Sequence, residues 1–337
     1  KRPKRLNIFR MKHKILTLLS FLFLILGPLN AQVYPGDHWP YDTIRKGWDE
    51  EKGKAFFEFI RDSSVVTGLM VVQDGKVVFD YGDLEENSYI ASCRKSVLAM
   101  LYGSYVENGT IALDKTIAEL NIDDVEGILP VEKRATVQDL ISARSGVYHP
   151  EGYPGGMQEY APERGSVKPG AYWLYSNWDF NVSGYIFEQE TGKKIYDEVE
   201  RQLALPLQMQ DWDRSLQKKQ GNTEISKYLA YPMWFSTRDM ARIGLLMLHR
   251  GTWKEQEVIS EDWVEEMLAS RTSYREVNAN VPVFRDSGIN FGYGYMWWLF
   301  EDMEDPRFEN AYAALGAMGQ AIVVFPRINT VVAYKTK

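Results

Sequence analysis

Residues 89–103 read YIASCRKSVLAMLYG, a short polar cluster followed by an apolar run. The pattern predicts a buried helix over 92–106 that ends before Asn108-Gly109. Ser92 and Lys95 are three positions apart, so their side chains lie on one helix face, one turn apart. Free N–H groups at the helix start favour negative charge near Ser92. A lysine buried there loses hydration, which lowers its pKa and lets it act as a base.

The Ser-x-x-Lys pattern by itself is weak, because about one is expected by chance in a chain of this length. A second copy, Ser215 to Lys218, lies in a polar stretch with no apolar helix behind it. Taken alone, Ser92 is better explained as a helix N-cap followed by a solvated lysine. Cys93 is an alternative nucleophile, but adjacent helical residues point about 100° apart, so we expect Cys93 to pack against its neighbours.

Outside this helix, strand patterns occur at both ends of the chain and helical patterns between them. Residues 67–82 contain two β-rich runs around Asp74-Gly75, which predicts a hairpin. Further strands are predicted at 291–300, 319–326 and 328–334. Further helices are predicted at 136–143, 179–190 and 236–248, the last with Ser236 and Asp239 resembling a capping box.

These patterns together predict an α+β fold with one antiparallel sheet formed from both chain ends. The sheet is flanked by helices and interrupted by a large all-helical insertion. We expect a single domain over 32–337, with its sheet part at about 55–91 and 285–337 and its helical part at about 92–284.

Residues 147–170 are rich in Gly, Pro and Tyr and are expected to form a loop over the helical part. Loops of that length are often functional. Its tyrosines, Tyr148, Tyr153 and Tyr160, line the pocket or lie on the surface, and the sequence does not separate these alternatives. His149 is placed to contact a substrate, although a lone loop histidine is more often solvated.

Two further motifs carry chemistry. Tyr175-Ser176-Asn177 lies 83 residues after Ser92 and is the only Tyr-x-Asn of the chain. Beside a lysine ammonium a tyrosine ionises more readily and can shuttle protons, and the amide of Asn177 can orient a lysine. The alternative for Tyr175 is aromatic packing. Residues 316–320 read GAMGQ and are expected to open a late strand, where Gly316 and Gly319 allow close approach of a substrate. The alternative is a bulge or tight turn.

The composition excludes several classes of function. Hydrophobic residues make up 45 % and charged residues 25 % of the chain, which is typical of a globular protein. Beyond residue 31 there are 32 Lys and Arg against 46 Asp and Glu, which argues against a general nucleic-acid binder. The single cysteine excludes an internal disulfide and a cysteine-cluster metal site. No HExxH, GxSxG or dinucleotide motif occurs, and we expect no metal and no cofactor.

Residues 1–31 are predicted to contain an upstream extension and a signal peptide. They hold seven Lys and Arg and no acidic residue, and Met11 is a natural start. An apolar run at 15–26 precedes a plausible cleavage point after Ala31. The run is shorter than the ~20 residues that span a bilayer, which favours a signal over a membrane helix. We therefore expect export to the periplasm or the medium, and no stable membrane span after cleavage.

In this order, the three motifs resemble those of the serine β-lactamase and penicillin-binding-protein superfamily. The resemblance is to the class C-like branch (peptidase S12), closest in style to the 6-aminohexanoate-dimer hydrolases and related esterases. It runs from about residue 55 to 337 and includes stretches at 136–146, 168–193, 203–213, 236–248 and 293–298. It implies a β-lactamase-like fold.

The resemblance also implies a role for each motif. Ser92 is the acylated nucleophile, and Lys95 and Tyr175 share the acid and base steps. Asn177 positions Lys95 and the substrate, and the backbone N–H groups of Ser92 and Ala317 form the oxyanion hole. Which of Lys95 and Tyr175 takes the first proton stays open, because coupled groups titrate as a pair.

The sequence departs from the family pattern in two respects. Class C β-lactamases and many penicillin-binding proteins carry Lys-Thr-Gly at the third motif, where the cation holds a substrate carboxylate. Leu315-Gly316-Ala317 offers no charge, and the later Lys335-Thr336-Lys337 lacks the glycine. Family members usually continue into a C-terminal helix, so we expect this sequence to stop short of it.

We therefore expect a serine esterase or amidase that acts on small esters or short amides. A β-lactamase or D-Ala-D-Ala carboxypeptidase is the alternative. It is disfavoured by the missing cation, since burying an unpaired carboxylate is costly, and favoured by export to a cell-wall compartment. A non-catalytic binding protein with the same fold is the third alternative, and the intact motif side chains argue against it.

Overall fold

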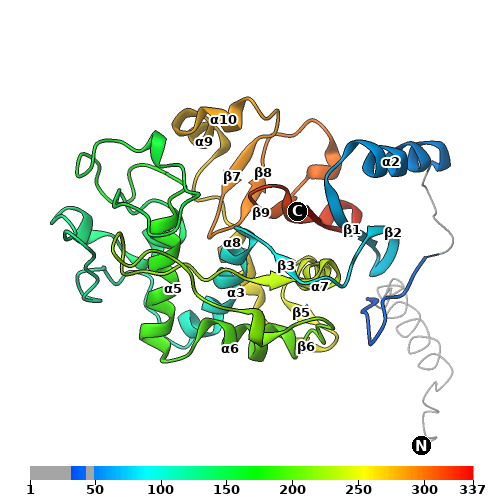
Figure 1. Ribbon diagram of the computed structural model, residues 1–337, viewed down its shortest axis with the longest axis horizontal. Coiled ribbons are helices and arrows are strands. Elements are labelled where there is room, and N and C mark those ends of the chain that lie inside the picture. The colour runs from blue at the N-terminus through cyan, green and yellow to red at the C-terminus, as the bar shows by residue number, and fades with distance from the viewer. Residues whose placement is uncertain (1–31, 43–48, 337) are drawn as a thin grey trace, which may run out of the picture. The chain divides into compact units, whose positions relative to one another are not determined.

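A seven-stranded antiparallel sheet assembled from both ends of the chain dominates the computed structural model (Figure 1). The structure describes residues 32–42 and 49–336, and the predicted signal segment lies outside them. The strand order is β2-β1-β11-β10-β9-β8-β7. Its strands are β1 (Val66–Gln73), β2 (Lys76–Gly82), β7 (Phe291–Tyr293), β8 (Trp298–Phe300), β9 (Tyr312–Gly316), β10 (Gln320–Phe325) and β11 (Thr330–Thr336). The predicted sheet is therefore confirmed.

The β1–β2 hairpin turns at Asp74 and Gly75, as predicted. Both residues have positive φ, 52° and 75°, which is the backbone of the tight hairpin turn that matches strand twist. Side chains alternate along β1 between the two faces of the sheet. Leu69 and Val71 pack beneath α2 (Glu50–Ser63), whereas Met70 and Val72 belong to the main core.

Helices fill the chain between the two groups of strands. They are α3 (Cys93–Glu107), α4 (Val137–Ile141), α5 (Asn177–Thr191), α6 (Ile195–Val199), α7 (Thr237–Leu248), α8 (Glu261–Leu268), α9 (Tyr274–Asn280) and α10 (Pro282–Arg285). Figure 1 shows α2 on one side of the sheet and α7 on the other. The α7 helix packs against β11, β10 and β1, and α3 packs against β9 and β10. The main core therefore lies between the sheet and the helical part.

Some predicted boundaries were wrong. The predicted strand at 291–300 is two strands, β7 and β8, because Met296 turns the chain with a φ of 58°. Strand β9 was missed, and α5 begins at Asn177 rather than Asp179. The insertion also holds short strands, so it is not all helical: β4 (Trp234–Phe235) pairs with β3 (Ser88–Tyr89), and β5 (Thr252–Trp253) pairs with β6 (Gln256–Glu257).

The start of α7 differs from the predicted capping box. The Ser236 hydroxyl accepts from the N–H of Asp239 at 3.1 Å, as an N-cap does. The Asp239 carboxylate does not return to Ser236. It accepts instead from the N–H groups of Gln210 and Asp211 at 2.9 and 3.0 Å, and so anchors a distant loop to α7.

From Tyr34 onward the described residues form one compact unit. Within the described ranges, no helix combines the length and the apolar character that a membrane crossing requires.

Candidate active site

Ser92 occupies the N-cap position of α3, directly after a strained residue. Ala91 has a φ of 47°, a left-handed conformation that is uncommon for alanine and that places Ser92 at the head of the helix. The Ser92 side chain makes no capping hydrogen bond, so its hydroxyl is left for other partners. This observation and the burial of Lys95 contradict the alternative of a simple N-cap followed by a solvated lysine.

Lys95 joins the first two motifs. Its Nζ lies 3.0 Å from Ser92 Oγ and 2.8 Å from the Tyr175 hydroxyl, and the residue is 1 % exposed. The Phe180 ring, 4.5 Å from Nζ, closes the apolar side of this pocket. Burial lowers the pKa of Lys95 well below its usual value, and the nearby Arg94 cation lowers it further. A buried amine in contact with a hydroxyl is therefore suited to accept the proton of that hydroxyl.

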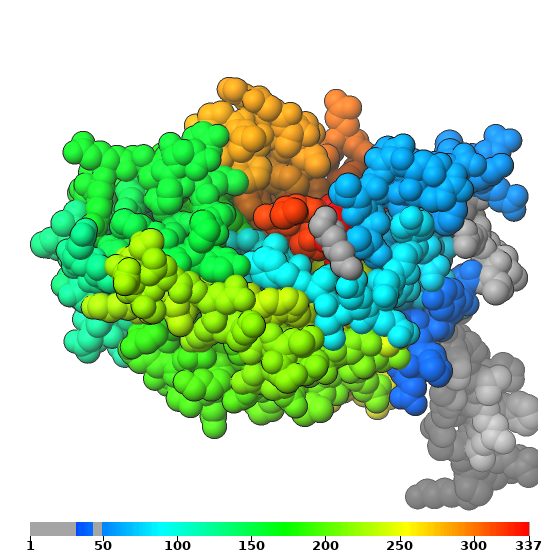
Figure 2. Space-filling view, in the orientation of Figure 1, coloured from blue at the N-terminus to red at the C-terminus, as the bar shows by residue number. Residues whose placement is uncertain are grey.

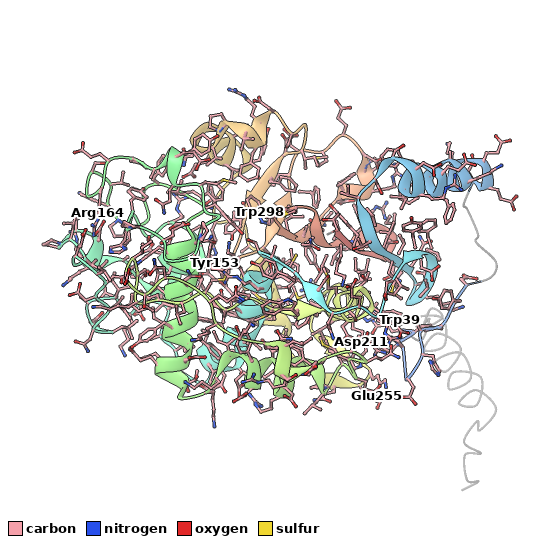
Figure 3. All side chains as sticks on the ribbon, in the orientation of Figure 1. Trp39, Tyr153, Arg164, Asp211, Glu255 and Trp298 are labelled. Atoms are coloured by element: carbon pink, nitrogen blue, oxygen red, sulfur yellow. The ribbon has the colours of Figure 1, made fainter. Side chains whose placement is uncertain are left out.

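Tyr175 is held in an aromatic wall. Its ring stacks on Trp298 of β8, with ring centroids 5.4 Å apart and planes inclined by 28° (Trp298 is labelled in Figure 3). Burial raises the pKa of the Tyr175 hydroxyl above its ordinary value, and the hydrogen bond with Ser92 opposes this only in part. The expectation that Tyr175 ionises more readily is therefore wrong for this state of the site, because desolvation outweighs the neighbouring charges.

Asn177 is the first residue of α5 and is almost fully buried. Its backbone N–H donates to Glu151 Oε1 at 2.6 Å, and its Nδ2 donates to the Tyr153 carbonyl at 3.4 Å. Its Oδ1 is buried, and no described residue hydrogen-bonds to it. The structure thus brings Asn177 beside Tyr175, but its hydrogen bonds go to the loop rather than to Lys95.

Most of the third motif forms the turn between β9 and β10, and only its last residue, Gln320, begins a strand. Gly316 ends β9 and Gln320 begins β10. Gly316 lies against the residues before Ser92, since an added Cβ would stand 2.7 Å from the Ile90 carbonyl and 3.0 Å from Ala91 Cβ. Gly319 has a φ of 96°, which only glycine adopts easily. Figure 2 shows the surface hollowed where this turn (red) meets the segment before α3 (cyan).

Other residues that the sequence singled out lie elsewhere. Cys93 is fully buried against the carbonyls of β9 and β10, and burial raises the pKa of its thiol to about 12, as expected for a packing residue. His149 is 2 % exposed rather than solvated, with Nε2 2.6 Å from the Val125 carbonyl. Lys335 Nζ donates to the carbonyls of Glu86 and Phe235, at 2.5 and 3.0 Å. Those two bonds tie Lys335 to backbone away from the third-motif turn.

Two residues near the site were not identified from the sequence. Arg94, inside the first motif, is 1 % exposed and lies 4.2 Å over the ring of Tyr231. Glu151, in the 147–170 loop, receives the N–H of Asn177. The position of Arg94 between Ser92 and Lys95 was an available signal, whereas nothing in the local pattern marks Glu151.

The described residues contain no group of three His, Cys, Asp or Glu side chains arranged to hold a metal ion. Lys95 Nζ lies in hydrogen-bond contact with the hydroxyls of Ser92 and Tyr175, an arrangement chemically suited to proton transfer and acyl transfer.

Comparisons with known proteins agree with this architecture. The family model described as Beta-lactamase matches residues 56–337. A protein assigned as a 6-aminohexanoate-dimer hydrolase from Bacillus anthracis is 18 % identical over 91 % of this chain and 84 % of its own, with a TM-score of 0.62. A penicillin-binding protein homologue from Pyrococcus abyssi is 19 % identical over 85 % and 73 %, with a TM-score of 0.60. A family VIII carboxylesterase is 14 % identical over 85 % and 90 %, with a TM-score of 0.59. At these identities the likeness shows the shared fold.

Proposed function

Because the chain belongs to the beta-lactamase family, we propose that it is a serine hydrolase that forms an acyl-enzyme on Ser92. The family and the fold indicate a hydrolase of the beta-lactamase superfamily. The finer proposal is an esterase or amidase for small esters or short amides, with Ser92, Lys95, Tyr175 and Asn177 as its side-chain machinery.

One observation carries the proposal: buried Lys95 Nζ contacts both the Ser92 hydroxyl and the Tyr175 hydroxyl. With its pKa lowered by burial, Lys95 is neutral more readily than an exposed lysine and is the better first base. It takes the Ser92 proton as Oγ bonds to the substrate carbonyl carbon and the carbonyl electron pair moves onto oxygen. That pair then reforms the carbonyl as the leaving group departs, protonated from Lys95 through the Tyr175 hydroxyl.

Deacylation repeats these steps with water in place of Ser92. Water loses its proton to the same pair of groups, attacks the acyl carbon and releases the acid, and Ser92 Oγ recovers its proton. The oxyanion at each stage is proposed to accept from the backbone N–H groups of Ser92 and Ala317. The close packing of Gly316 on Ile90 and Ala91 supports this pairing, because it sets the turn beside the head of α3.

The third-motif turn favours uncharged substrates. Residues 316–320 carry no charge, and Met318 at the tip of the turn is 78 % exposed. A substrate carboxylate placed there would lose water without gaining a cation, which is costly. The unpartnered Oδ1 of Asn177 adds a polar atom that can accept an N–H from a short amide. We therefore place β-lactams and D-Ala-D-Ala peptides second.

The test compares turnover of p-nitrophenyl butyrate and of nitrocefin by the full chain. Ser92→Ala removes the proposed nucleophile, and Ser215→Ala is the matched control in the second Ser-x-x-Lys sequence. We expect ester turnover that falls at least about 10³-fold in Ser92→Ala and is unchanged in Ser215→Ala. Rapid nitrocefin turnover by the wild type would instead make the protein a β-lactamase.

Covalent labelling separates an enzyme from a binding protein. A fluorophosphonate probe should add one phosphonyl group to the wild type and to Ser215→Ala, and none to Ser92→Ala. An unlabelled wild type that also leaves the ester intact would refute the proposed function.

We also propose that the protein is exported, on the strength of the basic and apolar pattern of residues 1–31. Expression from Met11 in a bacterium should yield periplasmic or secreted protein whose first residue is Gln32. Intact N-termini in the cytoplasmic fraction alone would contradict export.

A further inference from the structure

A segment of the 147–170 loop lies across the second motif. Residues 151–158, called the strap below, hydrogen-bond to every residue of Tyr175-Ser176-Asn177. Three of these bonds are Met157 N–H to the Tyr175 carbonyl at 2.8 Å, Gln158 Nε2 to Ser176 Oγ at 3.3 Å, and Asn177 N–H to Glu151 Oε1 at 2.6 Å. Three bonds to three consecutive residues fix both the backbone and the direction in which this motif enters α5.

The Glu151 carboxylate is the centre of the strap. Its Oε1 accepts from Asn177 N–H and from Gln158 Nε2, and its Oε2 accepts from Gly156 N–H at 3.1 Å. Ser176, the N-cap of α5, makes no side-chain capping bond. Glu151 therefore supplies from the loop the acceptor that a free helix N–H needs, and its negative charge is favourable at a helix N-terminus.

We propose that Glu151 is a positioning residue of the active site, whose carboxylate clamps the strap onto the first residue of α5 and so sets the places of Tyr175 and Asn177 relative to Lys95. The inference rests on the proposed function. Glu151 acts on the proposed reaction through Asn177 and the backbone of the motif. Its two carboxylate oxygens already accept three hydrogen bonds.

Gly156 leaves the space that the Glu151 carboxylate occupies. An added Cβ on Gly156 would lie 2.0 Å from Glu151 Oε1, so a larger residue would displace the carboxylate. Tyr153, within the strap, gives its carbonyl to Asn177 Nδ2 and its hydroxyl to the Tyr89 hydroxyl at 3.2 Å (Tyr153 is labelled in Figure 3). The strap is thus tied to the strand that precedes Ser92 as well as to α5.

The charge of Glu151 also acts on Lys95. Burial and the Arg94 cation lower the pKa of Lys95, and Glu151 and Cys93 act in the opposite direction. Removing the carboxylate should therefore lower the pKa of Lys95 further. The acidic limb of the pH–rate profile, where Lys95 gains a proton and stops acting as a base, should then move to lower pH.

The test uses Glu151→Gln in the full chain, with Glu159→Gln as the matched control. Glu159 lies on the same loop, is exposed, and its loss removes an equal charge. A glutamine offers one acceptor oxygen, so one of the donors at Glu151 would face an amide N–H₂. For p-nitrophenyl butyrate we expect kcat to fall about 10- to 100-fold with KM within about twofold, because small displacements of catalytic groups cost rate. The acidic limb should shift to lower pH.

Gly156→Ala gives a second, independent variant. It keeps the carboxylate charge and displaces the carboxylate, so kcat should fall while the protein stays folded by circular dichroism. Glu159→Gln should match the wild type in kcat and in the position of the acidic limb. Equal kcat and an unmoved acidic limb in folded Glu151→Gln would overturn the positioning role, as would a loss of thermal stability alone.

The rate of fluorophosphonate labelling distinguishes this inference from the proposed function. A wild type that is not labelled and leaves the ester intact refutes the function itself. A labelled wild type with equal labelling of Glu151→Gln at every pH refutes only the role of Glu151. The hydrogen bond between Glu151 and Asn177 can also be tested without a substrate. Because it is short, it should shift the resonance of the Asn177 amide proton downfield in the NMR spectrum. An unshifted resonance, identical in Glu151→Gln, would contradict the clamp.

Discussion

Burial and neighbouring charges together set the pKa of Lys95 in the candidate active site. Among the residues that the structure describes, the hydrogen-bond partners of Lys95 Nζ are the neutral hydroxyls of Ser92 and Tyr175. The neighbouring Arg94 is itself buried, donates from Nη2 to Asn181 Oδ1 at 3.2 Å and lies over Tyr231. Placing a fixed cation next to a buried amine disfavours a second positive charge, so the lysine loses its proton more easily. Arg94 and Glu151 therefore shift the pKa of Lys95 in opposite directions.

Arg94→Met should move the acidic limb of the pH–rate profile to higher pH, opposite to Glu151→Gln. In the proposed mechanism Lys95 acts as a base when neutral, above its pKa, and removing the nearby Arg94 cation should raise that pKa. Activity at neutral pH should fall, and stability should drop by about 1–3 kcal/mol because Asn181 loses its donor. The pH dependence of kcat/KM for an ester measures the shift.

The matched control for this variant is Arg242→Met. Arg242 is equally buried and donates to the Leu207 and Gly36 carbonyls, away from the catalytic side chains. It should lower stability without moving the acidic limb. If both arginine variants leave the limb in place, the electrostatic role of Arg94 is wrong.

At the scale of elements, the local patterns and the sheet that joins both chain ends were predictable, but contacts made through an aperiodic loop were not. The position of Lys95 one turn after Ser92 follows from helix geometry alone. The contact of Glu151 with Asn177 joins residues 26 positions apart through a loop without periodicity, so no sequence pattern reports it. Strand β9, reading YAALG, lacks the β-branched residues that marked β10 and β11. Met296 turns the chain without being a turn-forming residue type.

The packing of α7 on the sheet depends on Gly244. A Cβ there would lie 2.4 Å from Val331 Cγ1 and 2.9 Å from Ile322 Cγ2, so Gly244→Ala forces the helix off β10 and β11. We expect a loss of about 1–3 kcal/mol, the usual cost of overpacking a core, in urea unfolding. Gly53→Ala is the matched control on α2, where an added Cβ meets nothing within 4 Å. It should stabilise by about 0.5–1 kcal/mol, and a Gly244→Ala protein as stable as the wild type would disprove the close packing.

At the scale of the whole molecule, the candidate active site lies beside a sheet in which the two chain ends pair. Strand β1 pairs with β11 across more than 250 positions, and the β9–β10 turn of the same sheet lies against the residues before Ser92. Pairings this distant in sequence form late and cooperatively. We therefore expect the proposed catalytic side chains and the turn between β9 and β10 to unfold together with the sheet.

Lys335→Met should lower the thermal stability of the sheet and of the candidate active site together. Lys335 Nζ on β11 donates to the carbonyls of Glu86, just before β3, and of Phe235 in β4, and β3 leads into Ser92. Methionine fills the space but leaves buried carbonyls without that donor, at a cost of about 1–3 kcal/mol. The thermal midpoints of near-ultraviolet circular dichroism and of esterase activity should fall together, by about 2–4 °C per kcal/mol. Lys76→Met on β2, where the residue is partly exposed, should leave both midpoints in place. Midpoints that separate in Lys335→Met would show that sheet and active site unfold independently.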